Sequence, residues 1–304
     1  MRTLFKRVFA GCVLTSAAGL ALAGPVILGG DDLTDHGTRT AGGVNLEGWL
    51  YIQKAVDNVL SGVTRAGVIT TNIVALGAAA NPTFTGSNAG GAIGSAANVL
   101  GKTVTYVDGA TAINQFFADL AAGTVNPGML WFAGTGAVND LDTAEGTALT
   151  NNAGAINAFG ASGGGIMAHG SGSVAYGWLS ALLPGIVEVV GACNSTGATL
   201  TAAGQAAFSG LNNSDINNLA GPCHSSFTGD FGGLTTLGLD GGGLSYIIGG
   251  GANTVIQCGQ TGQPACPTGE LPEPSSILLA TMAGLALVVQ QRRRRTTLTD
   301  RSSH

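Results

Sequence analysis

Short apolar runs alternate with segments of helical period between residues 25 and 190, and this alternation constrains the fold more than any other feature. Six of the runs have the length and composition of buried strands. They cover residues 25–28, 73–76, 104–107, 129–132, 166–168 and 187–190. Because buried strands that alternate with amphipathic helices are typical of parallel sheets, we expect an α/β fold whose sheet carries helices on both faces.

Four segments between these runs place apolar side chains at helical spacing. They cover residues 47–60, 111–122, 142–159 and 174–183. In the third segment, Asp142 and Glu145 have the spacing of a capping box. The helical period argues against an all-β adhesin, the alternative that the low charge and the Asn, Thr and Gly content favour.

The globular domain is expected over residues 24–256, with its core at 25–190 and a looser, disulfide-tied extension at 191–256. Three elements are expected in the extension: a helix at 201–208, turns at 212–218 and a strand at 244–248. Residues 257–270 are rich in Gly, Pro, Gln and Thr, which predicts a linker.

This domain carries few charges, and most of them are negative. Only 10% of the whole chain is charged, against about a quarter in ordinary soluble domains. Between residues 24 and 269 there are 14 carboxylates and four cations, namely Arg39, Lys54, Arg65 and Lys102. Since a strongly acidic body is repelled by phosphate, we expect neither nucleic acid nor an anionic membrane surface as its partner.

Residues 1–23 have the order of a secretory signal peptide. Basic residues precede an apolar stretch, and an A-x-A sequence at 21–23 precedes Gly24. We therefore expect export with cleavage after Ala23. A lipoprotein site at Cys12 is the alternative, but only four apolar residues separate it from Arg7.

Residues 271–295 join three features in a fixed order. They are the triplet Pro272, Glu273 and Pro274, an apolar run at 277–289, and the arginines Arg292, Arg293, Arg294 and Arg295. A helix of about 13 residues is roughly 20 Å long, short of a hydrocarbon core of about 30 Å, so its flanks must help it to span. Because basic flanks resist translocation, the arginines should stay cytoplasmic and the body outside. A plain tail anchor is the alternative, but an anchor does not require the triplet.

This segment resembles the PEP-CTERM sorting signal of Gram-negative bacteria, which consists of Pro-Glu-Pro, a short transmembrane helix and an arginine cluster. The resemblance implies recognition by an exosortase and cleavage near the triplet. The protein would then pass from an inner-membrane intermediate to the cell surface or the extracellular matrix, with extracellular polysaccharide as a further candidate partner. Residues 296–304 form a tail beyond the point where such signals usually stop.

Removal of the signal peptide leaves four cysteines, an even number in an exported chain, which predicts disulfides. Three pairings are open, and proximity favours Cys193 with Cys223 and Cys258 with Cys266. No C-x-x-C spacing is present, so a zinc site is the weaker interpretation.

Polar residues follow several predicted strands, at the edge where doubly wound parallel sheets bind their ligands. The ligand-binding candidates are Asp31, Asp32, His36, Asp108, Asp140 and His169. Carboxylates and histidines are ligands of divalent cations, and the candidate metal ligands are Asp31, Asp32, Asp35 and His36. The alternative is that the aspartates cap turns and the next helix while the histidines lie in loops.

Residues 162–170 resemble the strand and nucleophile turn of class I glutamine amidotransferase-like domains, whose fold is flavodoxin-like. On the best register of their G-x-C-x-G turn, residues 165–169 put Met167 at the position of the nucleophile. A thioether cannot attack a carbonyl as a thiolate does, so the resemblance implies the fold with an altered or non-catalytic site. The catalytic candidates are then His169 and Ser171, although their surroundings lack the flanking glycine of a G-x-S-x-G elbow.

Two functions are therefore expected, and they belong to different classes. The first is an exported, exosortase-processed protein whose flavodoxin-like domain binds a ligand or partner without turnover and without a cofactor. The second is an extracytoplasmic hydrolase that uses His169 and the loop from Asp31 to His36, with a divalent metal as its candidate cofactor. The two differ in whether His169, Asp31, Asp32 and His36 converge on one open pocket.

Overall fold

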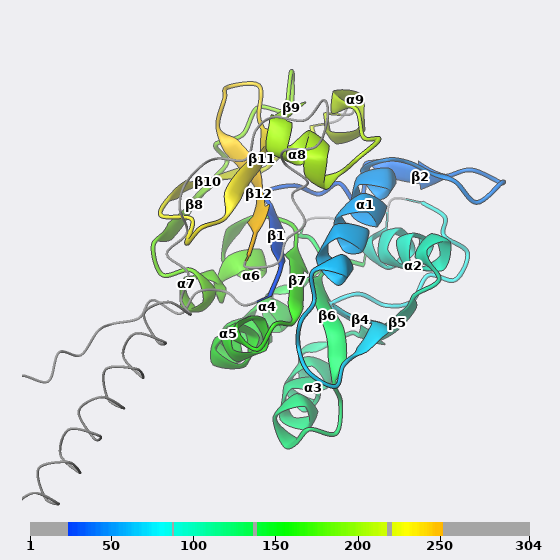
Figure 1. Cartoon of the computed structure of the whole chain (residues 1–304), viewed down its shortest axis with the longest axis vertical. Coiled ribbons are helices and arrows are strands. Elements are labelled where there is room, and N and C mark those ends of the chain that lie inside the picture. The colour runs from blue at the N-terminus through cyan, green and yellow to red at the C-terminus, as the bar shows by residue number, and fades with distance from the viewer. Residues whose placement is uncertain (1–23, 87, 136–138, 218–220, 252–304) are drawn as a thin grey trace, which may run out of the picture. The chain divides into compact units, whose positions relative to one another are not determined.

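The computed structural model describes residues 24–86, 88–135, 139–217 and 221–251 (Figure 1). All of them belong to one compact unit. The expected signal peptide, linker, sorting signal, transmembrane helix and tail lie outside the described residues, as do Cys258 and Cys266. In the part of the chain that the structure describes, no helix is both long enough and apolar enough to cross a membrane.

Ten strands form one mixed sheet, and two more form a separate hairpin, β2 with β3. The order across the sheet is β5-β4-β6-β7-β1-β12-β10-β8, and β11 pairs with β12 and with β9. The strands are β1 (Val26–Gly29), β2 (Gly37–Arg39), β3 (Asn45–Glu47), β4 (Ile69–Leu76), β5 (Thr103–Val107), β6 (Pro127–Phe132), β7 (Gly165–Ala168), β8 (Ile186–Val190), β9 (Thr199–Leu200), β10 (Ser225–Gly229), β11 (Thr235–Leu239) and β12 (Ser245–Gly250).

Five neighbouring strands, β5, β4, β6, β7 and β1, run parallel and correspond to the first five predicted runs. Every residue of β1, β6 and β7 is buried, which explains why these runs are continuously apolar. The predicted parallel sheet is confirmed only in part, because β12 joins β1 antiparallel and β10 pairs antiparallel with both β12 and β8. Strand β11 also pairs antiparallel with β12, because only residues 240–244 connect the two strands, too few for a parallel crossover.

Helices cover the parallel strands on two sides (Figure 1). They are α1 (Gly48–Ser61), α2 (Ala89–Leu100), α3 (Ala110–Ala122), α4 (Thr143–Asn151), α5 (Ala153–Ala161), α6 (Gly172–Tyr176), α7 (Leu179–Leu182), α8 (Ala202–Ala207) and α9 (Asn213–Ile216). Helix α1 packs on α2, whereas α3 contacts α4 and α5 contacts α7. Right-handed crossovers place α1 and α2 on one face and α3 to α5 on the other, because the chain reverses its direction across the sheet after β5.

Two of the predicted helices are interrupted. The segment 142–159 forms α4 and α5, which meet at Asn152, where the side-chain amide donates to the carbonyl of Ala148 (2.8 Å) and competes with the helical ladder. The segment 174–183 forms α6 and α7. The predicted capping box is confirmed, since Asp142 accepts from the Glu145 amide and Glu145 accepts from the Asp142 amide, both at 2.8 Å.

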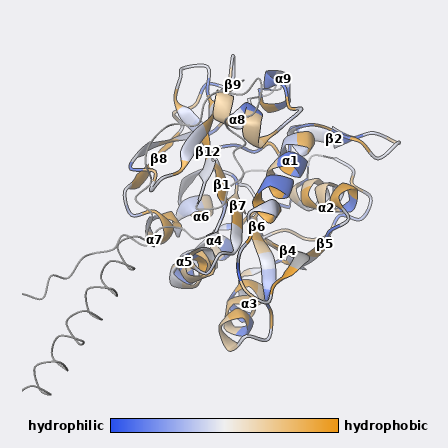
Figure 2. Cartoon of the chain, viewed as in Figure 1, coloured by the Kyte–Doolittle hydropathy of each residue, from blue (hydrophilic) through white to orange (hydrophobic). Residues whose placement is uncertain are grey.

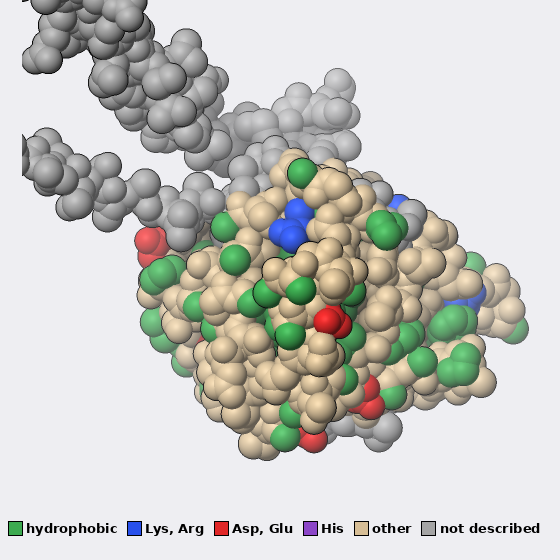
Figure 3. Space-filling view, turned by 90° about the horizontal axis from the view of Figure 1, so that it is seen from below, with side chains coloured by type: hydrophobic (Ala, Val, Ile, Leu, Met, Phe, Trp, Pro, Cys, Tyr) green, Lys and Arg blue, Asp and Glu red, His purple; other side chains and the backbone are tan. Residues whose placement is uncertain are grey.

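The core lies between the sheet and its helices, and its largest side chains are Trp49, Trp131 and Trp178, each at most 1% exposed. Figure 2 shows hydrophobic colour along β1 and β7, and hydrophilic patches along α1. In the face drawn in Figure 3, charged side chains are few and scattered. Against so apolar a background, buried ionisable side chains such as Asp31 and His169 require an explanation.

Candidate functional site

The parallel strands β1 and β7 bring Asp31 and His169 together. Because Leu28 pairs with Ala168, the residues just beyond the two strands are neighbours at the carboxyl edge of the sheet. His169 Nδ1 lies 3.0 Å from Asp31 Oδ1, and both side chains are completely buried. We call these two residues the buried pair. Sequence reasoning placed both at this edge, but it did not predict their burial.

The buried pair sits among aromatic side chains and is only partly satisfied. The ring of His169 lies 5.5 Å from that of Trp131 and 6.2 Å from that of Tyr51. Among the described residues, Asp31 Oδ2 and His169 Nε2 have no hydrogen-bond partner, nor do Tyr51 Oη and Trp131 Nε1. Each such atom costs about 1–3 kcal/mol of folding free energy, so the arrangement calls for a compensating role.

Asp31 is held in place by the backbone around it. Its Oδ1 also accepts from the amide of Leu33 (3.1 Å), and its carbonyl accepts from Gly170 (2.7 Å). A Cβ on Gly29 would collide with the Asp31 carboxylate. The glycine after β1 therefore allows the carboxylate to turn back against the strand.

A second group of ionisable side chains lies further out, and we call it the acid–histidine cluster. It consists of Asp32, Asp35, His36, Asp140 and His224. His36 Nε2 lies 3.2 Å from one oxygen of Asp32, and His224 Nε2 lies 2.8 Å from the other. One carboxylate is therefore shared by two imidazoles.

Each partner changes the protonation of the others. The hydrogen bond to Asp32 raises the pKa of His36 and of His224, and burial opposes this only in part. Burial alone would raise the pKa of Asp32, but the hydrogen bonds from His224 and His36 lower it. The His224 side chain is 45% exposed, whereas those of Asp32 and His36 are 14% and 15% exposed, so the cluster opens toward solvent at His224.

Asp35 and Asp140 form the acidic side of the cluster. Burial, with repulsion from Asp140 and Asp32, raises the pKa of Asp35 to about 7. Both carboxylate oxygens of Asp35 are buried and have no hydrogen-bond partner in the described part of the chain. A Cβ on Gly134 would lie 3.6–3.7 Å from the Asp140 carboxylate and from Thr34 Oγ1, which places these groups around one point after β6.

His224 reaches this cluster from the C-terminal part of the domain, and it was not among the candidates named from the sequence. Cys223 forms a β-bridge with Asp31, the amide of Asp32 donates to Pro222 (2.9 Å), and that of His224 donates to Gly30 (2.7 Å). The structure joins Cys223 to Cys193 in a disulfide, the pairing that proximity favours. The neighbouring cysteine was the signal that could have located His224.

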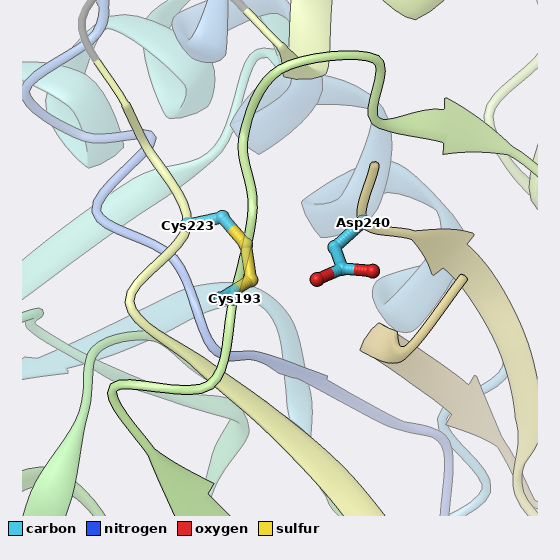
Figure 4. Close-up of side chains that lie close together, drawn as sticks. All are labelled: Cys193, Cys223 and Asp240. Carbon is cyan, nitrogen blue, oxygen red and sulfur yellow. A yellow bond between two sulfur atoms is a disulfide. The ribbon is translucent and has the colours of Figure 1, made fainter. Parts of the chain in front are cut away.

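Figure 4 shows the disulfide beside Asp240. Among the described residues, Cys193, Cys223 and Asp240 are the one group that places three ligand atoms within 4.8 Å of one another. The two sulfurs are bonded to each other, and Asp240 accepts from backbone amides, including Asn194 (2.8 Å) and Leu244 (2.6 Å). This group therefore offers no metal site. The candidate metal ligands Asp31, Asp32, Asp35 and His36 provide no such set within the described residues.

The remaining candidates lie apart from the buried pair or take part through their backbone. Asp108 is exposed after β5, and three strands separate β5 from β1, a distance of about 19 Å at the usual strand spacing. Ser171 is held by its backbone, whose amide donates to Thr135 Oγ1 (3.0 Å) and whose carbonyl accepts from it (3.2 Å). The proposed register of the nucleophile turn is wrong, because Met167 lies inside β7, fully buried, and the turn begins only at His169.

Comparison with known proteins gives no relative from which a function could be transferred. No family model, no curated protein and no solved structure matches the chain.

Proposed function

We propose that this chain is an exported protein of a Gram-negative bacterium, sorted and processed by an exosortase through residues 271–295, whose α/β domain binds a ligand or partner without turning over substrate. The order of triplet, apolar run and arginines supports the delivery route. The acid–histidine cluster at the carboxyl edge of the sheet is the proposed binding site.

The complete burial of the buried pair carries the non-catalytic part of the proposal. A general base must approach the proton that it removes to about 2.6–3.2 Å. Neither His169 nor Asp31 exposes any surface from which a substrate could be reached. Ser171 lies at the turn, but the neighbouring imidazole of His169 is buried, and Cys193 and Cys223 are bonded to each other.

The outer cluster has the properties of a recognition site. Its side chains are 14% exposed at Asp32, 15% at His36 and 45% at His224, so a ligand would approach the cluster at His224. The cluster contains three carboxylates, which are acceptors, and this favours a ligand that presents hydrogen-bond donors or positive charge.

The flavodoxin-like assignment is proposed in a permuted form. A flavodoxin-like sheet has the order 2-1-3-4-5. The parallel strands here follow that order if counting starts at β4 and the N-terminal β1 is taken as the fifth strand. A class I amidotransferase-like ancestry agrees with this order.

Activity assays test the binding proposal against the hydrolase alternative. Model esters, amides and glycosides are offered to wild type, His169→Ala and His169→Gln, with and without divalent metal, and circular dichroism verifies folding. We expect no turnover by any of the three. Turnover by wild type that disappears in both folded variants would contradict the proposal and establish the hydrolase.

A separate experiment tests delivery. Replacing Pro272, Glu273 and Pro274 by alanines in an exosortase-bearing host should leave a full-length, membrane-retained precursor. Glu270→Ala, just outside the triplet, is the matched control and should be processed normally. Normal processing of the triplet variant would refute the sorting assignment without affecting the binding proposal.

A further inference from the structure

A cavity of about 560 Å³ lies beside the disulfide, and no residue of the acid–histidine cluster lines it. Its volume is within the range of small-molecule sites, about 300–1,000 Å³. The described residues of its wall come from the end of β3, from the loop after Cys193, from α9 with Asn217, and from Gly221. The lining residues are Glu47, Ser195, Thr196, Gly197, Ser214, Asp215, Asn217 and Gly221.

The wall of this cavity is fixed by hydrogen bonds within the protein. Ser195 Oγ accepts from the amide of Cys223 (3.0 Å), which ties the two disulfide-linked loops together. Asp215 accepts from the amide of Asn212 (2.7 Å), and Asn217 donates to the carbonyl of Ala198 (3.1 Å). A site that is held in shape before binding loses less entropy when a ligand arrives.

Glu47 is the unusual residue of the wall. Its backbone has φ 57° and ψ −132°, a conformation that glycine adopts readily and other residues adopt under strain. The hairpin imposes it, because Glu47 pairs with Gly37 and the next amide, Gly48, donates to the His36 carbonyl (2.9 Å).

The carboxylate of Glu47 does not compensate for this strain locally. Glu47 occupies the N-cap position of α1, where an acidic side chain could accept from the first amides, yet it makes no capping hydrogen bond. Glu47 lines the cavity instead. A strained position that keeps a carboxylate where glycine would fit better indicates a role for that carboxylate in the cavity.

The lining defines the class of ligand. Among the described residues it provides three hydroxyls, one amide and two carboxylates, with no Lys, Arg or His and no aromatic ring. Acceptors exceed donors, and the two carboxylates repel anions. We propose that this cavity binds a small, non-anionic molecule with several hydroxyl or ammonium groups, of the size of one or two sugar rings, and that Glu47 is its central acceptor.

Calorimetry on the full chain tests this site with four probes: glucosamine, glucose, 1,4-diaminobutane and glucose 6-phosphate. We expect glucosamine to bind and glucose 6-phosphate to bind less well than glucose. Equal affinities for glucose and glucosamine would assign recognition to the hydroxyls. Higher affinities for both amines than for glucose would assign recognition to the ammonium group. Both outcomes support the site. The absence of binding by glucose and by both amines, or preference for the phosphate ester, would overturn it.

The variant Glu47→Gly separates function from folding. It should weaken probe binding by about tenfold or more, since a charged acceptor is lost, and raise the melting temperature by about 2–4 °C, since the strain is relieved. Asp57→Asn removes one carboxylate from a different cavity and should leave binding unchanged. Unchanged binding in Glu47→Gly, a lower melting temperature in that variant, or equal losses in both variants would each contradict the proposal.

Discussion

Asp35→Asn should stabilise the domain at pH 8 but not at pH 4. Burial and repulsion from neighbouring carboxylates raise the pKa of Asp35 from 3.8 to about 7. Because the folded-state pKa lies above the unfolded one, the carboxyl takes up a proton on folding between about pH 4 and pH 7. The free energy of unfolding therefore falls as the pH rises through that window. Asparagine does not titrate, so it removes this loss.

The size of the effect follows from the shift and from the exposure of Asp35. A difference of about three pKa units corresponds to about 4 kcal/mol at full burial. Asp35 is only about half-buried, so solvent screening reduces the effect to about 2 kcal/mol. At 2–4 °C for each kcal/mol in a domain of this size, the melting temperature at pH 8 should rise by about 4–8 °C.

Urea unfolding at pH 4 and pH 8 measures this difference directly. Asp57→Asn, which removes a carboxylate from the exposed side of α1, is the matched control and should change stability by less than about 0.5 kcal/mol at either pH. Equal gains for Asp35→Asn at both pH values, or no gain at pH 8, would refute the argument. If the cluster binds donors as proposed, the stabilised variant should also bind its ligand less tightly.

Two further outcomes are expected. Replacing Cys193 and Cys223 by serines should destabilise the fold by about 3.5 kcal/mol, because the disulfide closes a loop of 30 residues. In NMR titrations of this variant, the pKa of His224 should fall toward its ordinary value while that of His36 stays raised. An unchanged pKa of His224 would contradict the idea that the disulfide holds His224 beside Asp32. Glu145→Ala should lower the free energy of unfolding, measured by chemical denaturation, by about 2–4 kcal/mol. The reason is that the amides of Gly109 (2.7 Å) and Asp142 (2.8 Å), which donate to the Glu145 carboxylate, lose their acceptor. A change below about 1 kcal/mol would show that water replaces the carboxylate.

Helix α2 shows why part of the fold could not be read from the sequence. Its sequence, AGGAIGSAANVL, contains three glycines, each of which disfavours a helix by about 1 kcal/mol relative to alanine. In the structure these positions allow close packing, since a Cβ on Gly91 would lie 3.1 Å from the Trp49 ring of α1. Tertiary packing overrides the local propensity here, whereas the apolar residues of α1 and α3 recur at helical spacing and so predict a helix from the sequence.

The parallel strands were predictable because burial on both faces leaves a continuous apolar run in each. Strands β10 and β11 were not, because each contains exposed residues and neither forms a continuous apolar run. The strand at 244–248 was expected, and it exists as β12, but nothing in its sequence indicates that it lies between β1 and β10.

The candidate site was predicted in the same partial way. Asp31 and His169 follow two strands that prove to be neighbours, so the rule about carboxyl edges brought them together correctly. Asp108 obeys the same rule but follows β5, at the far end of the parallel block. Which strands are adjacent decides which edge residues meet, and adjacency is a long-range property that one sequence does not display.

The antiparallel strands also determine what the edge can do. Strand β12 covers the free side of β1, the carbonyl of Tyr246 accepts from Gly30 (2.7 Å), and the bridge from Cys223 to Asp31 closes over the end of β1. The same segment that encloses the buried pair carries His224 to Asp32 on the outside. An edge that would expose an acid and a histidine to substrate is thereby converted into a closed interior pair and an open outer cluster. This conversion is the physical reason for preferring recognition over turnover in this domain.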